Sequence, residues 1–259
     1  MSTESEEQLA EGSLVSHLVE LRSRLIRSAL SILLIFVCLI PFAERTFTIV
    51  ATPLMERLPE NATMIATQVA SPFLTPFKTS LFVAVFLSMP VILYQVWGFI
   101  APGLYRKEKR FASPLLISSI VLFYSGVAFA YFVVFPLMFG FFAAVSPEGV
   151  TMMTDISSYL DFILTIFFAF GLAFEVPIAT VMLVWSGLVS LEVLGKARAY
   201  VFLGAFVMGM LLTPPDAISQ TLLAVPVYIL YEAGLILAKV LGKQDDASAS
   251  ADQSDSTDV

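Results

Sequence analysis

The sequence predicts an all-α integral membrane protein that crosses the bilayer six times. Of its 259 residues, 58% are hydrophobic and only 14% are charged, whereas a soluble domain is about half apolar and a quarter charged. The apolar residues form charge-free runs, several of them as long as the ~20 residues that a helix needs to span a bilayer. Lysine and arginine gather in alternate connections between these runs, which indicates how the chain is threaded through the membrane.

Both ends of the chain are expected to be disordered acidic tails, residues 1–12 and 243–259. Nine of the 21 acidic residues but only one of the 14 basic residues, Lys243, lie in these tails, so the rest of the chain carries 12 acidic against 13 basic residues. The net charge of −7 therefore describes the tails and says little about partners of the membrane domain, residues 13–242.

The first span is expected at residues 25–42, with Pro41 kinking its far end. A short amphipathic helix at the membrane surface should lead into it, because four leucines recur there at helical spacing: Leu14, Leu18, Leu21 and Leu25. Arginines precede this apolar run as they do in a signal peptide, but no small-x-small cleavage site follows it. We therefore expect a retained helix.

The connection 43–76 is expected to lie outside the cytoplasm and to be structured. Pro53 is expected in the first turn of a short helix at residues 50–58. Together with the second outer loop, 146–155, which has no lysine or arginine, this connection should form an extracytoplasmic cap. Several of its apolar side chains should be buried there: Met64, Ile65, Val69, Phe73 and Leu74.

The next three spans are expected at residues 77–100, 114–142 and 160–187, the first of them interrupted by Pro90. The last two, 198–213 and 217–235, are short for an average bilayer. They should form a hairpin, because a helix cannot continue through Pro214 and Pro215, which separate them.

The distribution of basic residues predicts that both termini are cytoplasmic. With the N-terminus inside, the inner segments carry Arg22, Arg24, Arg27, Arg106, Lys107, Lys109, Arg110, Lys196, Arg198, Lys239 and Lys243, and the outer ones carry Arg45, Arg57 and Lys78. The count of 11 against 3 also favours an even number of spans.

Enzyme chemistry finds little support in the sequence. A single histidine, His17, and a single cysteine, Cys38, exclude a zinc site built from several such ligands. No phosphate-binding loop, nucleophile elbow or zinc-protease motif occurs. We expect no catalytic residue, metal, cofactor or nucleic-acid partner.

Glu108 is the only acid in the basic stretch Tyr94–Arg110. Helical ion pairs form between residues three or four apart, and none of the positions at that spacing is basic: Leu104, Tyr105, Phe111 and Ala112. Glu108 is therefore either an acid neutralised by its neighbours in sequence or half of a docking site for a basic peptide.

For Glu20 and Glu175 the sequence leaves alternatives open, and three other residues have one default interpretation each. Glu20 has Arg24 four residues on and is by default an ordinary surface pair, with peptide binding as the alternative. Glu175 lies in the middle of a span, which costs at least ~2.5 kcal/mol, so it serves function or helix packing, or is protonated and bonded to a neighbouring helix. Asp216 is by default an N-cap of the last span. Phe99 and Trp97 are by default aromatics at the membrane surface.

Seven stretches resemble those of one known family: HLVELR at 17–22, MIAT at 64–67, SPF at 71–73, PVILYQVW at 90–97, FIAPGLY at 99–105, FEVP at 174–177 and LLTPPD at 211–216. The family is TatC, the multi-spanning receptor subunit of the twin-arginine protein translocase. The resemblance covers about residues 13–240 and implies six spans in a concave, glove-like shape.

The resemblance also implies a function and a site. Such a receptor sits in the bacterial cytoplasmic membrane and binds the twin-arginine signal peptides of folded proteins on the cytoplasmic side. Glu20, Arg22, Phe99 and Glu108 map to that site. Polar intramembrane positions linked to the single-span partners TatA and TatB map to Glu175, Gln220 and Asp216, and the structural prolines are Pro53, Pro90, Pro214 and Pro215. Export is driven by the proton motive force, and the subunit is a homo-oligomer within a TatBC complex.

The chemistry of arginine agrees with this implication. A guanidinium prefers a carboxylate that it binds through two parallel hydrogen bonds, and a lysine fits that fork less well. The alternative from a different class is a proton-coupled transporter of a small solute that uses Glu175. Against it, the halves of the chain show no repeat, and one deep acid is a thin ion pathway.

Overall fold

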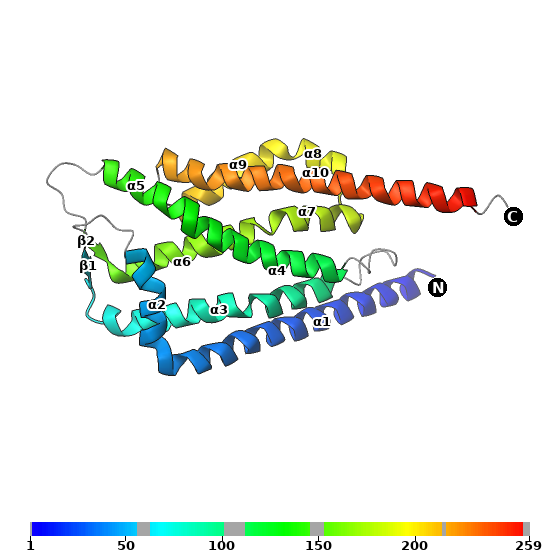
Figure 1. The fold of residues 1–259 in the computed structure, drawn as a ribbon. Helices are drawn as coiled ribbons and strands as arrows, with labels where there is room; N and C mark the ends of the chain where they lie inside the picture. Colours follow the sequence, from blue (N-terminus) through cyan, green and yellow to red (C-terminus); the bar gives the residue numbers. More distant parts are fainter. Residues whose placement is uncertain (1, 56–62, 101–111, 146–152, 214–215, 256–259) are drawn as a thin grey trace.

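The structure is a computed structural model that describes residues 2–55, 63–100, 112–145, 153–213 and 216–255. Within these ranges it consists of helices and two short strands (Figure 1). The elements run in the order α1 Ser2–Leu39, the 3₁₀ turn η1 Ile40–Phe42, α2 Ala43–Met55, β1 Thr63–Ile65, α3 Ser71–Ile100, α4 Ala112–Phe129, the π-helical turn η4 Ala130–Val134, α5 Phe135–Val145, β2 Met153–Asp155, α6 Ile156–Ala173, α7 Val176–Trp185, α8 Leu191–Lys196, α9 Arg198–Leu212 and α10 Ala217–Asp255.

An apolar helix covers each stretch for which a span is predicted. In the described part of the chain, five helical stretches are long and apolar enough to cross a membrane: His17–Ala51, Ser71–Phe99, Ser113–Phe142, Ile156–Trp185 and Ala217–Val240. The sixth, Arg198–Leu212, is apolar but shorter. The protein is thus a helical membrane protein with at least five candidate spans, and the count of six stays a prediction.

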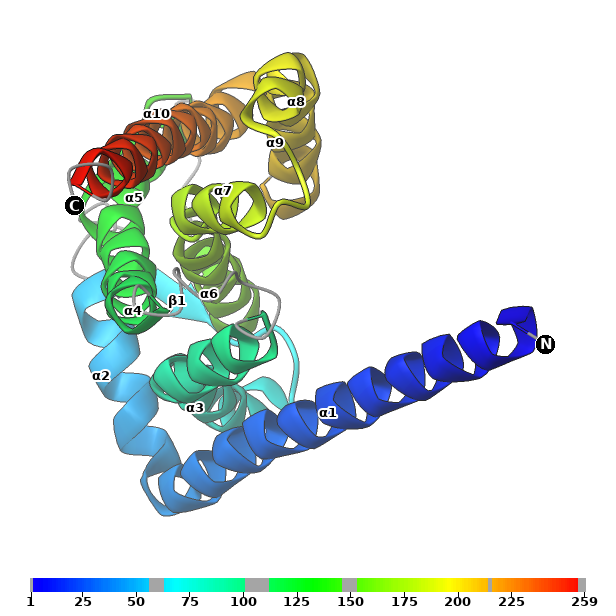
Figure 2. The ribbon, with the colours of Figure 1, turned by 90° about the vertical axis from the view of Figure 1, so that its right-hand side faces the viewer.

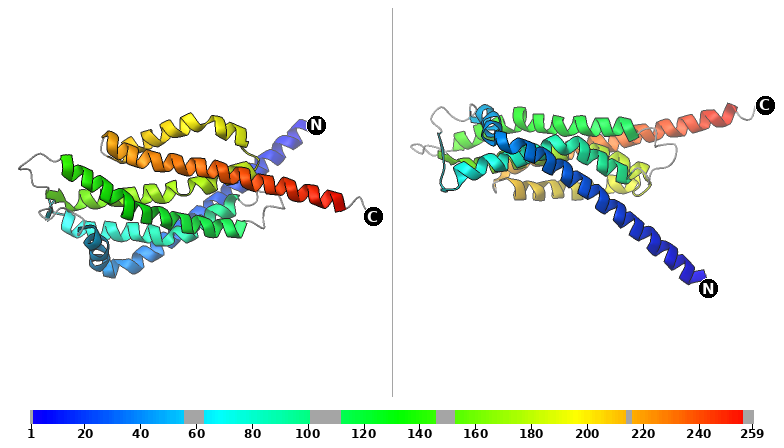
Figure 3. Two further views of the ribbon diagram at one scale, coloured as in Figure 1. Left: turned by 45° about the horizontal axis from the view of Figure 1, so that its top comes forward. Right: turned by 90° about the horizontal axis from the view of Figure 1, so that it is seen from below.

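Both termini lie at one end of the bundle, and α2 and the two strands lie at the other (Figure 1). Helix α1 packs along α3, but its N-terminal part projects away from the other helices (Figure 2; Figure 3). Helix α3 ends, and α4 begins, at the same end of the bundle as the termini (Figure 1).

Helix α1 begins at Ser2 and α10 continues to Asp255. Both helices thus reach into the tails, whose expected disorder stays a prediction. Each tail extends a helix that is already nucleated, and adding a residue to a formed helix is much easier than starting one. Residues 6–11 consist entirely of leucine, alanine, glutamate and glutamine, all good helix formers.

The prolines act differently from one another. Pro41 lies in η1, where the chain turns from α1 into α2 (Figure 1), so the predicted kink is confirmed. Pro53 lies near the C-terminal end of α2, which begins at Ala43, and not in a first helical turn. Pro90 does not interrupt α3. It leaves the carbonyl of Phe86 without its helical donor, and the Tyr124 hydroxyl donates to that oxygen at 2.9 Å.

Two glycines set how closely α4 and α6 approach. A Cβ atom on Gly126 would lie 2.4 Å from the backbone oxygen of Phe170, and one on Gly171 would lie 2.5 Å from the ring of Phe123. At both positions a side chain larger than the hydrogen of glycine does not fit. The buried apolar side chains form two clusters, one made of Ala130, Val134, Phe135, Met138, Tyr159, Ile163, Ile166, Phe170 and Leu223, and the other made of Met89, Leu93, Trp97, Leu115, Phe123, Ile178, Val181, Met182, Trp185 and Ala238.

The strands β1 and β2 join the two connections from which a cap is predicted. They pair in parallel with the register Thr63↔Met153, Met64↔Thr154 and Ile65↔Asp155. The expected burial of apolar side chains around them is wrong for four residues, because Ile65, Val69, Phe73 and Leu74 are exposed. At the end of a membrane helix, lipid can cover side chains that no protein segment covers.

Both carboxylate oxygens of Asp155 accept hydrogen bonds at the β1–β2 junction. Oδ2 accepts hydrogen bonds from the hydroxyl and the amide of Thr67 at 2.7 and 2.9 Å. Oδ1 accepts from the amides of Ser157 and Ser158 at 3.0 Å and so caps the N-terminus of α6. The Thr67 hydroxyl first, then the backbone amides, hold the pKa of Asp155 well below its ordinary value.

This pKa predicts an acid-dependent loss of stability. A carboxylate whose pKa is lower in the folded than in the unfolded chain contributes fully above the unfolded pKa, about 3.9, and progressively less as the pH falls below it. We expect the apparent melting temperature of the detergent-solubilised protein to fall more steeply below about pH 4 than that of Asp155→Asn. Asparagine keeps the helix cap. Parallel curves for the two proteins would contradict the prediction.

Candidate functional site

Five residues meet where α1 lies against the end of α3, and we call them the α1–α3 cluster: His17, Glu20, Arg24, Gly98 and Phe99. His17, Glu20 and Arg24 are spaced three and four residues apart, so they share one face of α1. Gly98 and Phe99 belong to the last turn of α3. The cluster lies at the end of the bundle that holds both termini (Figure 1).

Glu20 and Arg24 form an ion pair. Nε and Nη2 of Arg24 both donate to Oε1 of Glu20, at 3.0 and 2.6 Å. The Arg24 side chain is only 20% exposed, and that of Glu20 is 38% exposed. The default interpretation of Glu20 is therefore correct as far as the partner goes, but the pair is half-covered by protein and not a fully solvated one.

The end of α3 covers this pair. The ring of Phe99 stacks on that of His17 with centroids 4.2 Å apart and an interplanar angle of 24°. The guanidinium of Arg24 lies over Gly98, so closely that a Cβ atom there would be 2.2 Å from Nη1. Phe99 is therefore held beside the same helix face that carries Glu20.

The structure brings together two of the residues predicted for a peptide site and leaves the rest apart. Glu20 and Phe99 both belong to the α1–α3 cluster. Arg22 occupies an exposed position on α1, and Glu108 lies outside the described residues. Sequence reasoning missed His17, Arg24 and Gly98 as parts of the site. The spacing of Glu20 and Arg24 signalled their pair, but nothing in the sequence signalled the contact of His17 with Phe99.

A second polar group is buried among α3, α4 and α6. Trp97 is 5% exposed, which corrects its interpretation as an aromatic at the membrane surface, and its Nε1 donates to the Ser119 hydroxyl at 3.1 Å. Glu175 lies beside Ser119, at the break between α6 and α7 that Pro177 follows. Oε1 of Glu175 is buried and has no hydrogen-bond partner among the described residues.

A third group lies at the start of α10. Oδ1 of Asp216 accepts a hydrogen bond from the amide of Ser219 at 2.7 Å, which confirms the N-cap. Oδ2 of Asp216 and the Ser219 hydroxyl are buried without a partner in the described part of the chain. The backbone of Gln220 packs against Gly209 of α9. Pro214 and Pro215, just before this group, lie outside the described residues.

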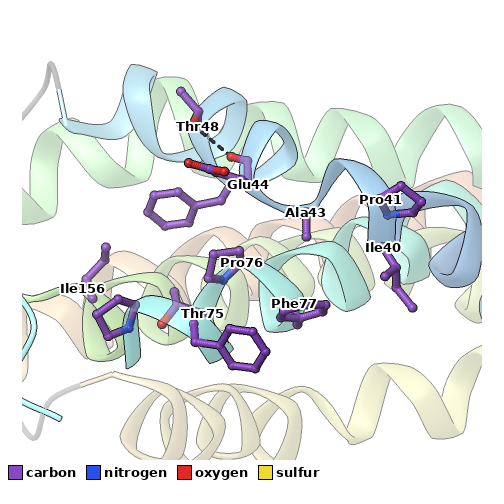
Figure 4. A pocket seen from close by; sticks show the side chains of 12 residues that line it. Ile40, Pro41, Ala43, Glu44, Thr48, Thr75, Pro76, Phe77 and Ile156 are labelled. Atoms are coloured by element: carbon purple, nitrogen blue, oxygen red, sulfur yellow. Dashed lines mark hydrogen bonds between the residues drawn. The ribbon is translucent and has the colours of Figure 1, made fainter. Parts of the chain in front are cut away.

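A cavity of about 550 Å³ lies at the opposite end of α1, between the α1–α2 corner and the start of α3 (Figure 4). Its walls are mostly apolar, and Glu44 is the acid among the lining residues. The Thr48 hydroxyl donates to the backbone oxygen of Glu44 at 2.9 Å (Figure 4). Ile40 is about 30 Å along the helix from Glu20, so the cavity is separate from the α1–α3 cluster.

Comparison with known proteins decides the family. The family model of the Sec-independent protein translocase protein TatC matches residues 16–226. This chain belongs to the TatC family. The TatC protein of Azotobacter chroococcum is 61% identical over 92% of this chain and 93% of its own length. That of Escherichia coli K12 is 53% identical over 87% and 88%.

A crystal structure of the twin-arginine translocase receptor TatC has the same fold. It superposes with a TM-score of 0.78 at 39% identity and covers 86% of this chain and 98% of the other. The matched region of the family model contains the α1–α3 cluster, Glu175 and Gln220. The resemblance found in the sequence motifs is therefore confirmed, and so is a multi-pass membrane protein. Among the described residues no group of histidine, cysteine or acidic side chains suits a metal ion.

Proposed function

We propose that this TatC-family chain is the receptor that binds the twin-arginine signal peptides of folded proteins at the cytoplasmic face of the bacterial inner membrane. With TatB and TatA it supports their export, which the proton motive force drives, and it catalyses no covalent chemistry. The observation that carries the proposal is that Glu20 already holds a guanidinium, that of Arg24, beside a stacked aromatic ring.

The α1–α3 cluster has the chemistry that an arginine ligand needs. A partly exposed carboxylate accepts two parallel hydrogen bonds from a guanidinium, and Glu20 is 38% exposed. A guanidinium also stacks on aromatic faces, and Phe99 provides one nearby. We place Arg22 at the rim of this site and Glu108 as its second carboxylate, which together would serve the two arginines of the signal.

The proposed topology has six spans with both termini in the cytoplasm. Its support is the distribution of basic residues and the location of both ends at one end of the bundle (Figure 1). In this orientation the α1–α3 cluster faces the cytoplasm, and the β1–β2 junction forms the extracytoplasmic cap.

For the single-span partners we propose Glu175, Gln220 and Asp216 as contact positions. Buried polar atoms without partners are costly, and Oε1 of Glu175 and Oδ2 of Asp216 have none among the described residues. A polar side chain from a neighbouring TatA or TatB helix would supply one. The proposed assembly is a homo-oligomer of this chain within a TatBC complex.

The test of the proposed function is crosslinking of a twin-arginine signal peptide to the protein in membranes. We expect Glu108→Lys to reduce the crosslink at least about tenfold, because it replaces an attractive charge with a repulsive one. A twin-lysine peptide serves as the control for non-specific contact. Undiminished crosslinking would remove Glu108 from the site, and no crosslink to the unmodified protein would refute the receptor function.

A further inference from the structure

We propose that Arg24 competes with an arginine of the signal peptide for binding to Glu20, and in this sense is an internal stand-in for that arginine. Arg24 forms its ion pair with Glu20 while no signal peptide is bound, and the peptide displaces it on binding. The inference rests on the proposed signal-peptide function and adds to it a residue that sets the affinity of the site.

The geometry of the pair suits an exchange of one guanidinium for another. Both hydrogen bonds of Arg24 end on the same oxygen, Oε1 of Glu20, so Arg24 leaves Oε2 unengaged. An incoming guanidinium can bind Oε2 first and take both oxygens as Arg24 withdraws. The carboxylate of Glu20 has a cationic partner throughout, which avoids leaving a charge unpaired.

The pair is also weak enough to exchange. A helical ion pair four residues apart that retains contact with water stabilises a protein only slightly. An intermolecular guanidinium that binds both oxygens and stacks on an aromatic ring makes more contacts than Arg24 does. Displacement therefore needs no large change in the protein, only a different rotamer of one long side chain.

Its contact with Gly98 distinguishes Arg24 from the basic residue of an ordinary surface ion pair. Its guanidinium rests on Gly98, where a side chain of any size would exclude it. The comparable pair of Lys196 and Glu192 on α8 has the same spacing, but its side chains are 77% and 78% exposed. The 20% exposure of Arg24 thus goes with the close contact that Gly98, which has no side chain, allows at the end of α3.

Arg24 and Gly98 provide two independent ways to remove the stand-in. Arg24→Gln deletes its charge. Gly98→Ala leaves Arg24 in the chain but places a methyl group where the guanidinium lies, 2.2 Å from Nη1 and 3.0 Å from Cζ. The end of a flexible side chain can move aside, so the fold should tolerate this variant.

The experiment measures binding of a fluorescent twin-arginine signal peptide to the purified full-length protein in nanodiscs. We expect Arg24→Gln and Gly98→Ala each to bind the peptide about two- to fivefold more tightly, the range that loss of a competing, partly exposed ion pair allows. The double variant should bind no more tightly than either single one, because both remove the same competitor.

The controls separate this inference from a structural effect and from the proposed function. Lys196→Gln breaks the matched pair on α8, and Gly204→Ala adds a methyl group where nothing lies within 4 Å; neither should change the affinity. Unchanged or weaker binding by Arg24→Gln would overturn the stand-in, even where Glu20→Gln abolishes binding and so upholds the receptor function. Absence of binding by the unmodified protein would overturn both.

Discussion

Replacing Glu20 with lysine is expected to weaken binding of a twin-arginine peptide roughly 100-fold, equivalent to about 2.7 kcal/mol. The change removes the carboxylate that accepts the guanidinium and puts a second cation within a helical turn of Arg24. An arginine from the cargo would then meet two positive charges where it now meets a neutral pair. Titration of the fluorescent peptide against the variant in nanodiscs measures the loss.

The fold itself should survive this substitution. Like charges four residues apart cost a helix only about 0.2–0.5 kcal/mol, and α1 packs against α3. Glu192→Lys is the matched control, because Glu192 also pairs with a basic residue four positions on, but on α8. If Glu20→Lys bound the peptide as tightly as Glu192→Lys does, Glu20 would not be a ligand of the signal.

The comparison of Glu20 with Phe99 shows how much of the site the sequence determines. The pair of Glu20 and Arg24 follows from helical spacing alone, because residues four apart share a face. The contact of Phe99 with His17 follows from the position of α1 along α3, which is set by all the contacts between the two helices. The same holds for Gly98, whose role is visible only once the guanidinium of Arg24 lies over it.

Some features of the fold could likewise be predicted from the sequence and others could not. Long apolar runs made the positions of the membrane helices predictable, because a span requires such a run. The pairing of β1 with β2 was not predictable, since each strand has only three residues and no alternating pattern marks so short a segment. Pro90 was expected to interrupt a span because the local rule is strong, yet a hydroxyl from another helix repairs the gap.

The second large effect is expected at Gly126, where α4 meets α6. Glycine to alanine within a helix stabilises the helix by up to about 1 kcal/mol when nothing opposes it. At Gly126 the added Cβ would lie 2.4 Å from the Phe170 oxygen and 2.9 Å from both the Phe170 carbonyl carbon and the ring of Phe174. Because a backbone group cannot rotate away, the two helices must separate, at a cost of about 1–3 kcal/mol or more.

We therefore expect Gly126→Ala to lower the free energy of unfolding by about 2 kcal/mol, measured by unfolding of the solubilised protein in denaturing detergent. Gly140→Ala on α5 is the control, because a Cβ atom there meets nothing within 4 Å, and it should be neutral or slightly stabilising. Equal stability of the two variants would mean that α4 and α6 adjust to a wider spacing. Trp97 and Ser119 join α3 to α4 at 3.1 Å, so separating α4 from α6 would also disturb the helix that carries Gly98 and Phe99.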